Sequence, residues 1–156
     1  MSRPDVSDAA AEVGKRLSRE ERCALLAEAR PAELQALADA CLADDVEVRV
    51  LLAPQVGCVT AQVREPVAGH RFQLGDVLAC RAEVELAGHR GWAMRLGDDR
   101  VATLAAAVLD AEAEAGRPGA VEVEALCRRV AARRAERLER EWAELAPTVV
   151  EFEELT

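Results

Sequence analysis

Aromatic side chains are scarce in this sequence, which has no tyrosine, two phenylalanines and two tryptophans among its 156 residues. Hydrophobic residues still make up 51% of the chain, so a core must be built from leucine, valine and alanine. Alanine favours helices but buries little apolar area, and burial stabilises by roughly 25 cal/mol per Å². We therefore expect one domain over residues 1–156, with a thin core and a surface that a partner completes.

Lysine, serine and histidine are rare as well, and each scarcity excludes a class of chemistry. Lys15 is the single lysine, and the phosphate-binding loop pattern is absent. The three serines lie within the first 18 residues, so a serine hydrolase is excluded. His70 and His89 lie in predicted loops, without nearby partners for a zinc site or a cysteine nucleophile. These residues predict no catalytic group and no metal site.

The five cysteines are widely spaced and form no CxxC pair, so neither a zinc knuckle nor an iron–sulfur cluster is encoded. Their odd number, with no signal peptide and no apolar run of about 18 residues, predicts a cytoplasmic protein without a membrane partner. Cys41, Cys58 and Cys80 lie in apolar stretches, which favours small buried side chains over reactive thiols.

The net charge is −9, and an acidic chain is a poor default binder of nucleic acid. One segment near the C-terminus is nevertheless rich in arginine. Interleaved glutamates pair with these arginines at i, i+4, and no aromatic residue is available for base stacking. The pattern favours a solvated or partner-facing helix, and a small regulatory or nucleic-acid-interacting protein stays open as the alternative. The arginines are Arg128, Arg129, Arg133, Arg134, Arg137 and Arg140.

Helical signals occupy both ends of the chain. Ser18 begins a capping box with Glu21, and Pro31 is placed to begin the next helix. Glycine and proline at 116–119 separate two later helices, the second long and ending before Pro147. We expect helices within 1–44 and 98–146, and a tail over 147–156 that alternates as an edge strand does. Apolar stripes support the helices at Leu34, Leu37, Ala38, Cys41 and Leu42, at Val101, Leu104, Ala105, Val108 and Leu109, and at Val123, Leu126, Val130, Leu138, Trp142 and Leu145.

Between the helices, residues 45–97 change to a period of two. Apolar and polar residues alternate over 46–50, 59–63, 80–86 and 92–96, and glycines at 88 and 91 fit a hairpin connection over 87–91. Alternation with one polar face is typical of an antiparallel sheet covered on one side. The sequence therefore predicts an α+β fold. Its mostly antiparallel, four-stranded sheet is packed by helices on one side, with N-terminal helices and a long C-terminal helix.

One junction is unusual for a chain so poor in aromatics. The stretch Arg71-Phe72-Gln73-Leu74-Gly75-Asp76 (RFQLGD) places a phenylalanine between a predicted loop and a predicted strand.

Together with four other segments, RFQLGD resembles the G subunit of the bacterial carbon–phosphorus lyase system, which handles organophosphonates. The others are LLAPQVGCVTAQVRE (Leu51–Glu65), AGHRGWAMRLGDD (Ala87–Asp99), AAAVLDA (Ala105–Ala111) and RCALLAEARPAEL (Arg22–Leu34). In the last of these the family often has Trp-Met where this chain has Arg22-Cys23, so an anchoring tryptophan contact is missing.

The resemblance implies a subunit of a core complex with subunits H, I and J, chiefly in contact with I. That complex is expected to displace adenine from ATP by a phosphonate, which gives a ribose 1-phosphonate 5-triphosphate. The iron–sulfur cluster and S-adenosylmethionine are expected in the J subunit, so this chain needs no cofactor of its own and is not expected to be active alone.

With that resemblance, we interpret RFQLGD as a structural junction or subunit interface without a catalytic role. Phe72 and Leu74 are expected to pack under the sheet or against the I subunit. Gly75 is expected to supply a special backbone angle, and Arg71 with Asp76 to fix the entry into the strand.

Overall fold

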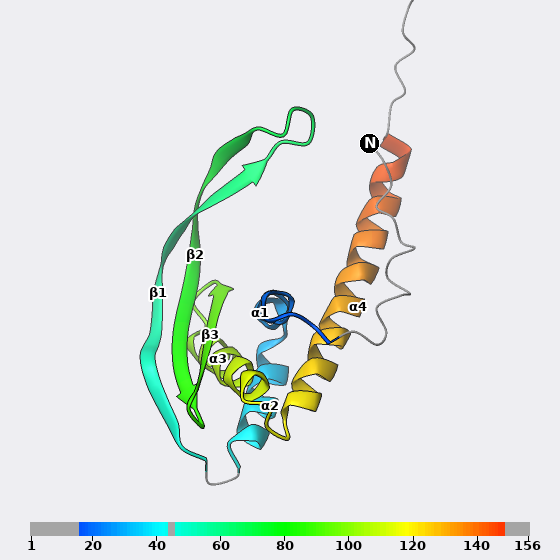
Figure 1. The fold of residues 1–156 in the computed structure, drawn as a ribbon. Coiled ribbons are helices and arrows are strands. Elements are labelled where there is room, and N and C mark those ends of the chain that lie inside the picture. Colours follow the sequence, from blue (N-terminus) through cyan, green and yellow to red (C-terminus); the bar gives the residue numbers. More distant parts are fainter. Residues whose placement is uncertain (1–15, 44–45, 149–156) are drawn as a thin grey trace, which may run out of the picture.

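The structure, a computed structural model, describes residues 16–43 and 46–148. Figure 1 shows a twisted sheet on one side of the molecule and helices on the other. The order along the chain is two helices, three antiparallel strands in the order β1-β2-β3, and two further helices. The predicted α+β class, antiparallel sheet and long C-terminal helix are confirmed.

The first two helices begin where the sequence predicts. In α1 (Arg19–Glu28), the Ser18 hydroxyl accepts from the Glu21 N–H at 3.2 Å, and the Ser18 N–H donates to the Glu21 carboxylate at 2.7 Å. These two hydrogen bonds complete a capping box. Helix α2 (Pro31–Cys41) has its proline at the first position. Its buried side chains are Leu34, Ala38 and Cys41.

The sheet has three strands within the described residues, so the expectation of four is corrected. Strand β1 (Val48–Arg64) runs through both segments that were predicted as separate strands. Strands β2 (Arg71–Leu86) and β3 (His89–Leu96) follow it. Pro54 does not break β1 because β1 lies at the edge of the sheet and its register slips between Leu52 and Gln55. Proline is tolerated at edges and bulges, where its missing N–H is not needed.

A tight turn joins β2 to β3. Ala87 and Gly88 have φ values of 49° and 79°, and two consecutive positive φ angles are the mark of a type I′ hairpin turn. The glycine-rich connection predicted over 87–91 is therefore shorter in the structure, because His89, Arg90 and Gly91 already belong to β3.

Helix α3 (Arg100–Glu114) covers the inner face of the sheet and contacts all three strands. Asp99 caps its first turn by accepting from the Ala102 N–H at 2.9 Å. A methyl group added at Gly91 of β3 would lie 2.1 Å from the Ala107 carbonyl oxygen. Small residues therefore let helix and sheet approach closely, which is how a core poor in aromatics is closed.

Strands β1 and β2 continue beyond the part of the sheet that β3 covers. The last pair between β2 and β3 is Ala79 with Leu96, and past it β1 and β2 pair only with each other. We call residues 59–77 the arm, and Figure 1 shows it as the upper part of the β1–β2 ribbon, beyond the end of β3. No residue of the arm is buried.

Helix α4 (Ala120–Leu145) also extends past the packed body, and a short 3-10 turn, Ala146–Thr148, follows it. Of its predicted apolar stripe, Val123, Leu126 and Val130 are buried, whereas Leu138 and Leu145 are exposed. The predicted C-terminal edge strand lies outside the described residues beyond Thr148. Among the residues described, no helix is both long and apolar enough to cross a membrane.

Candidate functional site

The RFQLGD junction lies at the end of the arm, where β2 begins. Phe72 is 48% exposed and Leu74 is 65% exposed. Neither side chain is packed beneath the sheet, which was one of the two expectations for them. Both lie where a second protein has access to them.

Gly75 lies at an irregularity in the strand pairing. Ala61 pairs with Gly75 and Gln62 pairs with Gln73, so Leu74 is an extra residue without a partner on β1. Such a bulge bends a strand and redirects its side chains. The φ angle of Gly75 is 146°, a conformation that residues with a side chain rarely adopt. The glycine therefore supplies the special backbone angle that the junction requires.

The two charged ends of the junction do not meet. Asp76 accepts a hydrogen bond from the Thr60 hydroxyl across the strand pair at 2.9 Å. Arg71 lies directly opposite Arg64 of β1. The structure thus separates the residues that were expected to fix the entry into β2 as a pair.

The turn at the tip of the arm is held by one carboxylate. Glu65 accepts from the N–H groups of Val67, Ala68 and His70, at distances of 2.8, 2.6 and 3.3 Å. The hydrogen bonds from Val67 and His70 contribute most to lowering the pKa of Glu65. This role was not predicted, because the three N–H groups converge on the Glu65 carboxylate only when the turn has formed.

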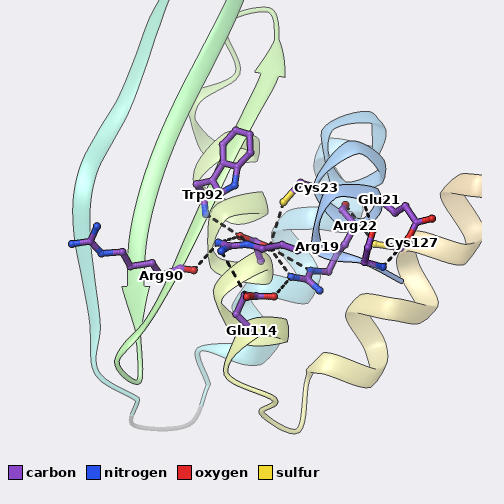
Figure 2. A network of polar contacts seen from close by, with 10 residues as sticks. Arg19, Glu21, Arg22, Cys23, Arg90, Trp92, Glu114 and Cys127 are labelled. Atoms are coloured by element: carbon purple, nitrogen blue, oxygen red, sulfur yellow. Dashed lines mark hydrogen bonds and ion pairs between the residues drawn. The ribbon is translucent and has the colours of Figure 1, made fainter. Parts of the chain in front are cut away.

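A second polar cluster lies inside the body, around Asp110 of α3 (Figure 2). The Arg19 Nη2 donates to Asp110 Oδ2 at 2.8 Å, and the Arg22 Nη2 donates to Asp110 Oδ1 at 3.0 Å. Arg22 also donates to Glu114 at 2.5 Å. Asp110 is fully buried, so its charge has lost its hydration. The two guanidinium partners offset that desolvation penalty.

The same carboxylate closes the free edge of the sheet. The Trp92 N–H of β3 donates to Asp110 Oδ2 at 3.1 Å, and Arg19 donates to the Arg90 carbonyl at 2.9 Å. These two backbone groups bond to side chains rather than to β2, so they lie on the open edge of β3. Figure 2 shows Arg19 and Arg22 reaching from α1 toward this edge. Side chains here replace a neighbouring strand.

Ionisation in this cluster favours charged arginines and neutral thiols. The hydrogen bond to Asp110 raises the pKa of Arg19. Burial opposes the charged form of Arg22, but hydrogen bonds to Glu114 and Asp110 outweigh it, so the pKa of Arg22 is raised as well. Burial, together with the neighbouring carboxylate, raises the pKa of Cys23 to about 12. The cluster is therefore a fixed ion-pair network that anchors α1.

Arg22 thus replaces the anchor whose loss was inferred from the Arg22-Cys23 departure. One signal for the network was present in the sequence, because Asp110 is the single carboxylate within the apolar run over 105–111. A second buried carboxylate, Glu112, joins α3 to the start of α4. It accepts from Arg117 Nε at 2.7 Å and from the Gly119 N–H at 3.0 Å.

Every buried side-chain nitrogen and oxygen in the described residues has a hydrogen-bond partner. Within the same residues, no group of three or more histidine, cysteine or acidic side chains is arranged to hold a metal ion. Cys41 and Cys80 are buried as predicted, but Cys58 is exposed because it lies where β1 leaves the body. The buried charges described here act in packing.

The arginines of α4 bond mainly to the body. Arg133 binds Glu33 of α2 with two hydrogen bonds of 2.9 and 2.8 Å, and both Arg134 and Arg137 pair with Glu28 of α1 at 3.4 Å. The predicted i, i+4 pair of Arg137 with Glu141 is present at 3.7 Å. These contacts hold α4 against α1 and α2. They also pair the positive charge of these arginines with glutamates, whereas a nucleic-acid interface requires positive charge that is free to contact phosphates.

Comparison with curated proteins finds no match to the chain. A family model described as phosphonate metabolism protein PhnG matches residues 17–156, which covers α1 through the C-terminus. The match includes the arm with RFQLGD and the Asp110 network. The chain therefore belongs to the PhnG family of phosphonate metabolism proteins.

Proposed function

We propose that this chain is a subunit of the carbon–phosphorus lyase core complex, and that its arm docks onto a partner subunit. The observation that supports this is the exposure of large apolar side chains on the arm. Val67, Phe72 and Leu74 are 94%, 48% and 65% exposed and contribute nothing to the core. Exposed apolar surface on a projecting element is characteristic of a protein interface.

The partners in this proposal are the H, I and J subunits, with the main contact to I. An aromatic side chain in a well-packed contact is the usual centre of binding energy, which gives Phe72 that role. The bulge at Leu74 and Gly75 fixes how the end of the arm is presented. Cofactor chemistry, with an iron–sulfur cluster and S-adenosylmethionine, is assigned to the J subunit.

The proposed reaction of the complex is a substitution at the anomeric carbon of the ribose of ATP. A phosphonate oxygen forms the new bond to this carbon while the bond to adenine breaks, and adenine leaves. The product is a ribose 1-phosphonate 5-triphosphate. We assign this chain a supporting role, because the charged groups buried in it are already used to join α1, α3 and α4.

Co-expression with the H, I and J subunits, followed by affinity purification through this chain, tests the proposal. We expect all four subunits to be recovered together. We also expect the complex, with its ATP-binding partner, to release adenine from ATP and methylphosphonate, and this chain alone to release none. Recovery of the chain without partners, or adenine release by the chain alone, would refute it.

The variant Phe72→Ala tests the arm itself, and Val121→Ala is its matched control. Val121 is 73% exposed at the start of α4, away from the arm. We expect Phe72→Ala to lower recovery of the complex and Val121→Ala to leave it unchanged. Equal recovery with both variants would show that the arm is not the docking element.

A further inference from the structure

The two faces of the arm differ in chemistry. Val63 pairs with Phe72, and these apolar side chains share one face. Residues two apart on a strand point to the same side, so the next pairs along the ribbon, Gln62 with Gln73 and Arg64 with Arg71, share the opposite face. At these pairs one face is therefore apolar, with Glu65 and His70 on it further toward the tip, and the other presents amide and guanidinium groups.

The opposed arginines are the unusual element. Directly paired residues have Cβ atoms about 4.5–5.5 Å apart, and like charges in that position destabilise a strand pair. Arg64 and Arg71 are both exposed, and neither makes an ion pair within the described residues. The pair therefore opposes the strand pairing unless an anion lies between the two side chains.

The nearest carboxylates along the arm bond to other groups and not to the two arginines. Glu65 is held by three N–H groups of the turn. Asp76 accepts from the Thr60 hydroxyl, two pairs further along the ribbon from the glutamines. The positive charge at the tip of the arm is therefore open to an anion from outside the chain.

We propose that Arg64 and Arg71, assisted by Gln62 and Gln73, bind the dianionic end of a phosphonate or phosphate group. A guanidinium group binds a phosphorus oxyanion with two parallel N–H···O bonds. Two adjacent guanidinium groups carry two positive charges, so they match a dianion better than they match a singly charged carboxylate. The amide nitrogens of the glutamines supply further donors. The site is inferred from these four residues and not from the docking of the arm, and phosphonate is included among the anions because of the family to which the chain belongs.

A free phosphonate or phosphate and the phosphate chain of a nucleotide share this chemistry, and a titration separates them. The full chain, labelled with ¹⁵N, is titrated at low ionic strength with methylphosphonate, inorganic phosphate and ATP in turn. The amide signals of Gly69, His70 and Gly75 report on the arm. We expect saturable shifts of these signals, weakened by added salt because both arginines are exposed. The anion that binds most tightly of the three shows whether the ligand is a phosphonate, free phosphate or the phosphate chain of a nucleotide.

Single variants localise the site. Arg64→Gln and Arg71→Gln are each expected to weaken binding by about tenfold, the loss of one charge-assisted contact. Arg129→Gln makes the same charge change on an exposed position of α4 and is expected to leave binding unchanged. Arg71→Lys keeps the charge without the planar fork, so it is expected to lie between wild type and Arg71→Gln.

Hydrogen exchange of the arm amides gives a second readout. Without an anion, Arg71→Gln removes the repulsion, so we expect slower exchange over residues 62–73 than in wild type. Methylphosphonate or phosphate should slow exchange in wild type and have little effect in the variant. The proposal is overturned if none of the three anions gives saturable shifts, or if the glutamine variants bind as wild type does.

Discussion

The body and the arm of this molecule treat polar and apolar side chains in opposite ways. In the body, the fully buried carboxylate of Asp110 is surrounded by arginines, and alanines bring α3 onto the sheet. In the arm, Phe72 and Leu74 face solvent, and Arg64 lies opposite Arg71. The body pairs its buried charges within one chain. The arm leaves apolar side chains open to solvent, and its two opposed arginines make no ion pair with another described residue.

On our proposals, this contrast separates residues that maintain the fold from residues that contact other molecules. A substitution in the body should change the free energy of unfolding, because its side chains are packed or paired inside the chain. An equivalent substitution in the arm should change binding while the melting temperature stays nearly constant. Matched positions, one packed in the body and one either in the arm or on the exposed part of β1 next to it, test whether the division holds.

The largest difference is expected between two aspartates. Asp110→Ala leaves the buried guanidinium of Arg22 with one partner fewer, and breaking a buried pair costs about 3–5 kcal/mol. Asp76→Ala removes one exposed hydrogen bond to Thr60, worth about 1 kcal/mol or less. Urea unfolding of both variants measures the contrast. Equal losses of stability would show that the Asp110 network is not what anchors α1.

A pair of glycines should give the next largest difference. In Gly91→Ala the new methyl group meets backbone atoms of α3 at 2.1 and 2.4 Å, so helix and sheet must separate, at a cost of about 3 kcal/mol. Gly57→Ala adds its methyl group to open space. We expect a clearly lower melting temperature only for Gly91→Ala. A similar melting temperature for both would contradict the close packing of α3 on β3.

Phe72→Ala and Leu126→Ala compare an exposed and a buried apolar side chain. Leu126 is a fully buried residue of α4, and such a change typically costs about 2–5 kcal/mol. Phe72 is half-exposed, so its replacement should lower the melting temperature little and should instead reduce recovery of the complex. A Phe72→Ala chain that assembles in full yield but has lost turnover would overturn the structural role of this residue.

The smallest expected effect concerns thiol reactivity. Burial raises the pKa of Cys41 and Cys127 to about 11 and that of Cys23 to about 12, which leaves little reactive thiolate at pH 8. Cys58 is exposed where β1 leaves the body. We expect iodoacetamide to modify Cys58 first, as read by peptide mass spectrometry, with Cys58→Ala as the control. Faster modification of Cys127 would show that the body opens readily.

Local signals in the sequence were sufficient for much of the body. Ser18 with Glu21 defines the start of α1, and Pro31 defines the start of α2, because caps depend on neighbouring residues alone. The single strand β1 was missed, because Pro54 and Gly57 resemble a break unless the strand is known to lie at an edge. Edge position is a property of the whole sheet.

Long-range pairs were missed for the same reason. Arg22 and Asp110 are 88 positions apart, and Arg133 bonds to Glu33 across 100 positions, so no spacing rule joins them. At the candidate site, the sequence indicated that RFQLGD is a junction, but not that it projects from the body. Projection depends on where β3 ends, at Leu96 opposite Ala79, and not on RFQLGD itself.

The way the sheet ends has a consequence for the protein before it meets any partner. At one border, Trp92 and Arg90 have their backbone groups occupied by Asp110 and Arg19, and at the other Pro54 has no N–H to offer. Unassembled chains are thus hindered at these points from stacking strand upon strand into fibres. The protein therefore has this protection before it binds any partner.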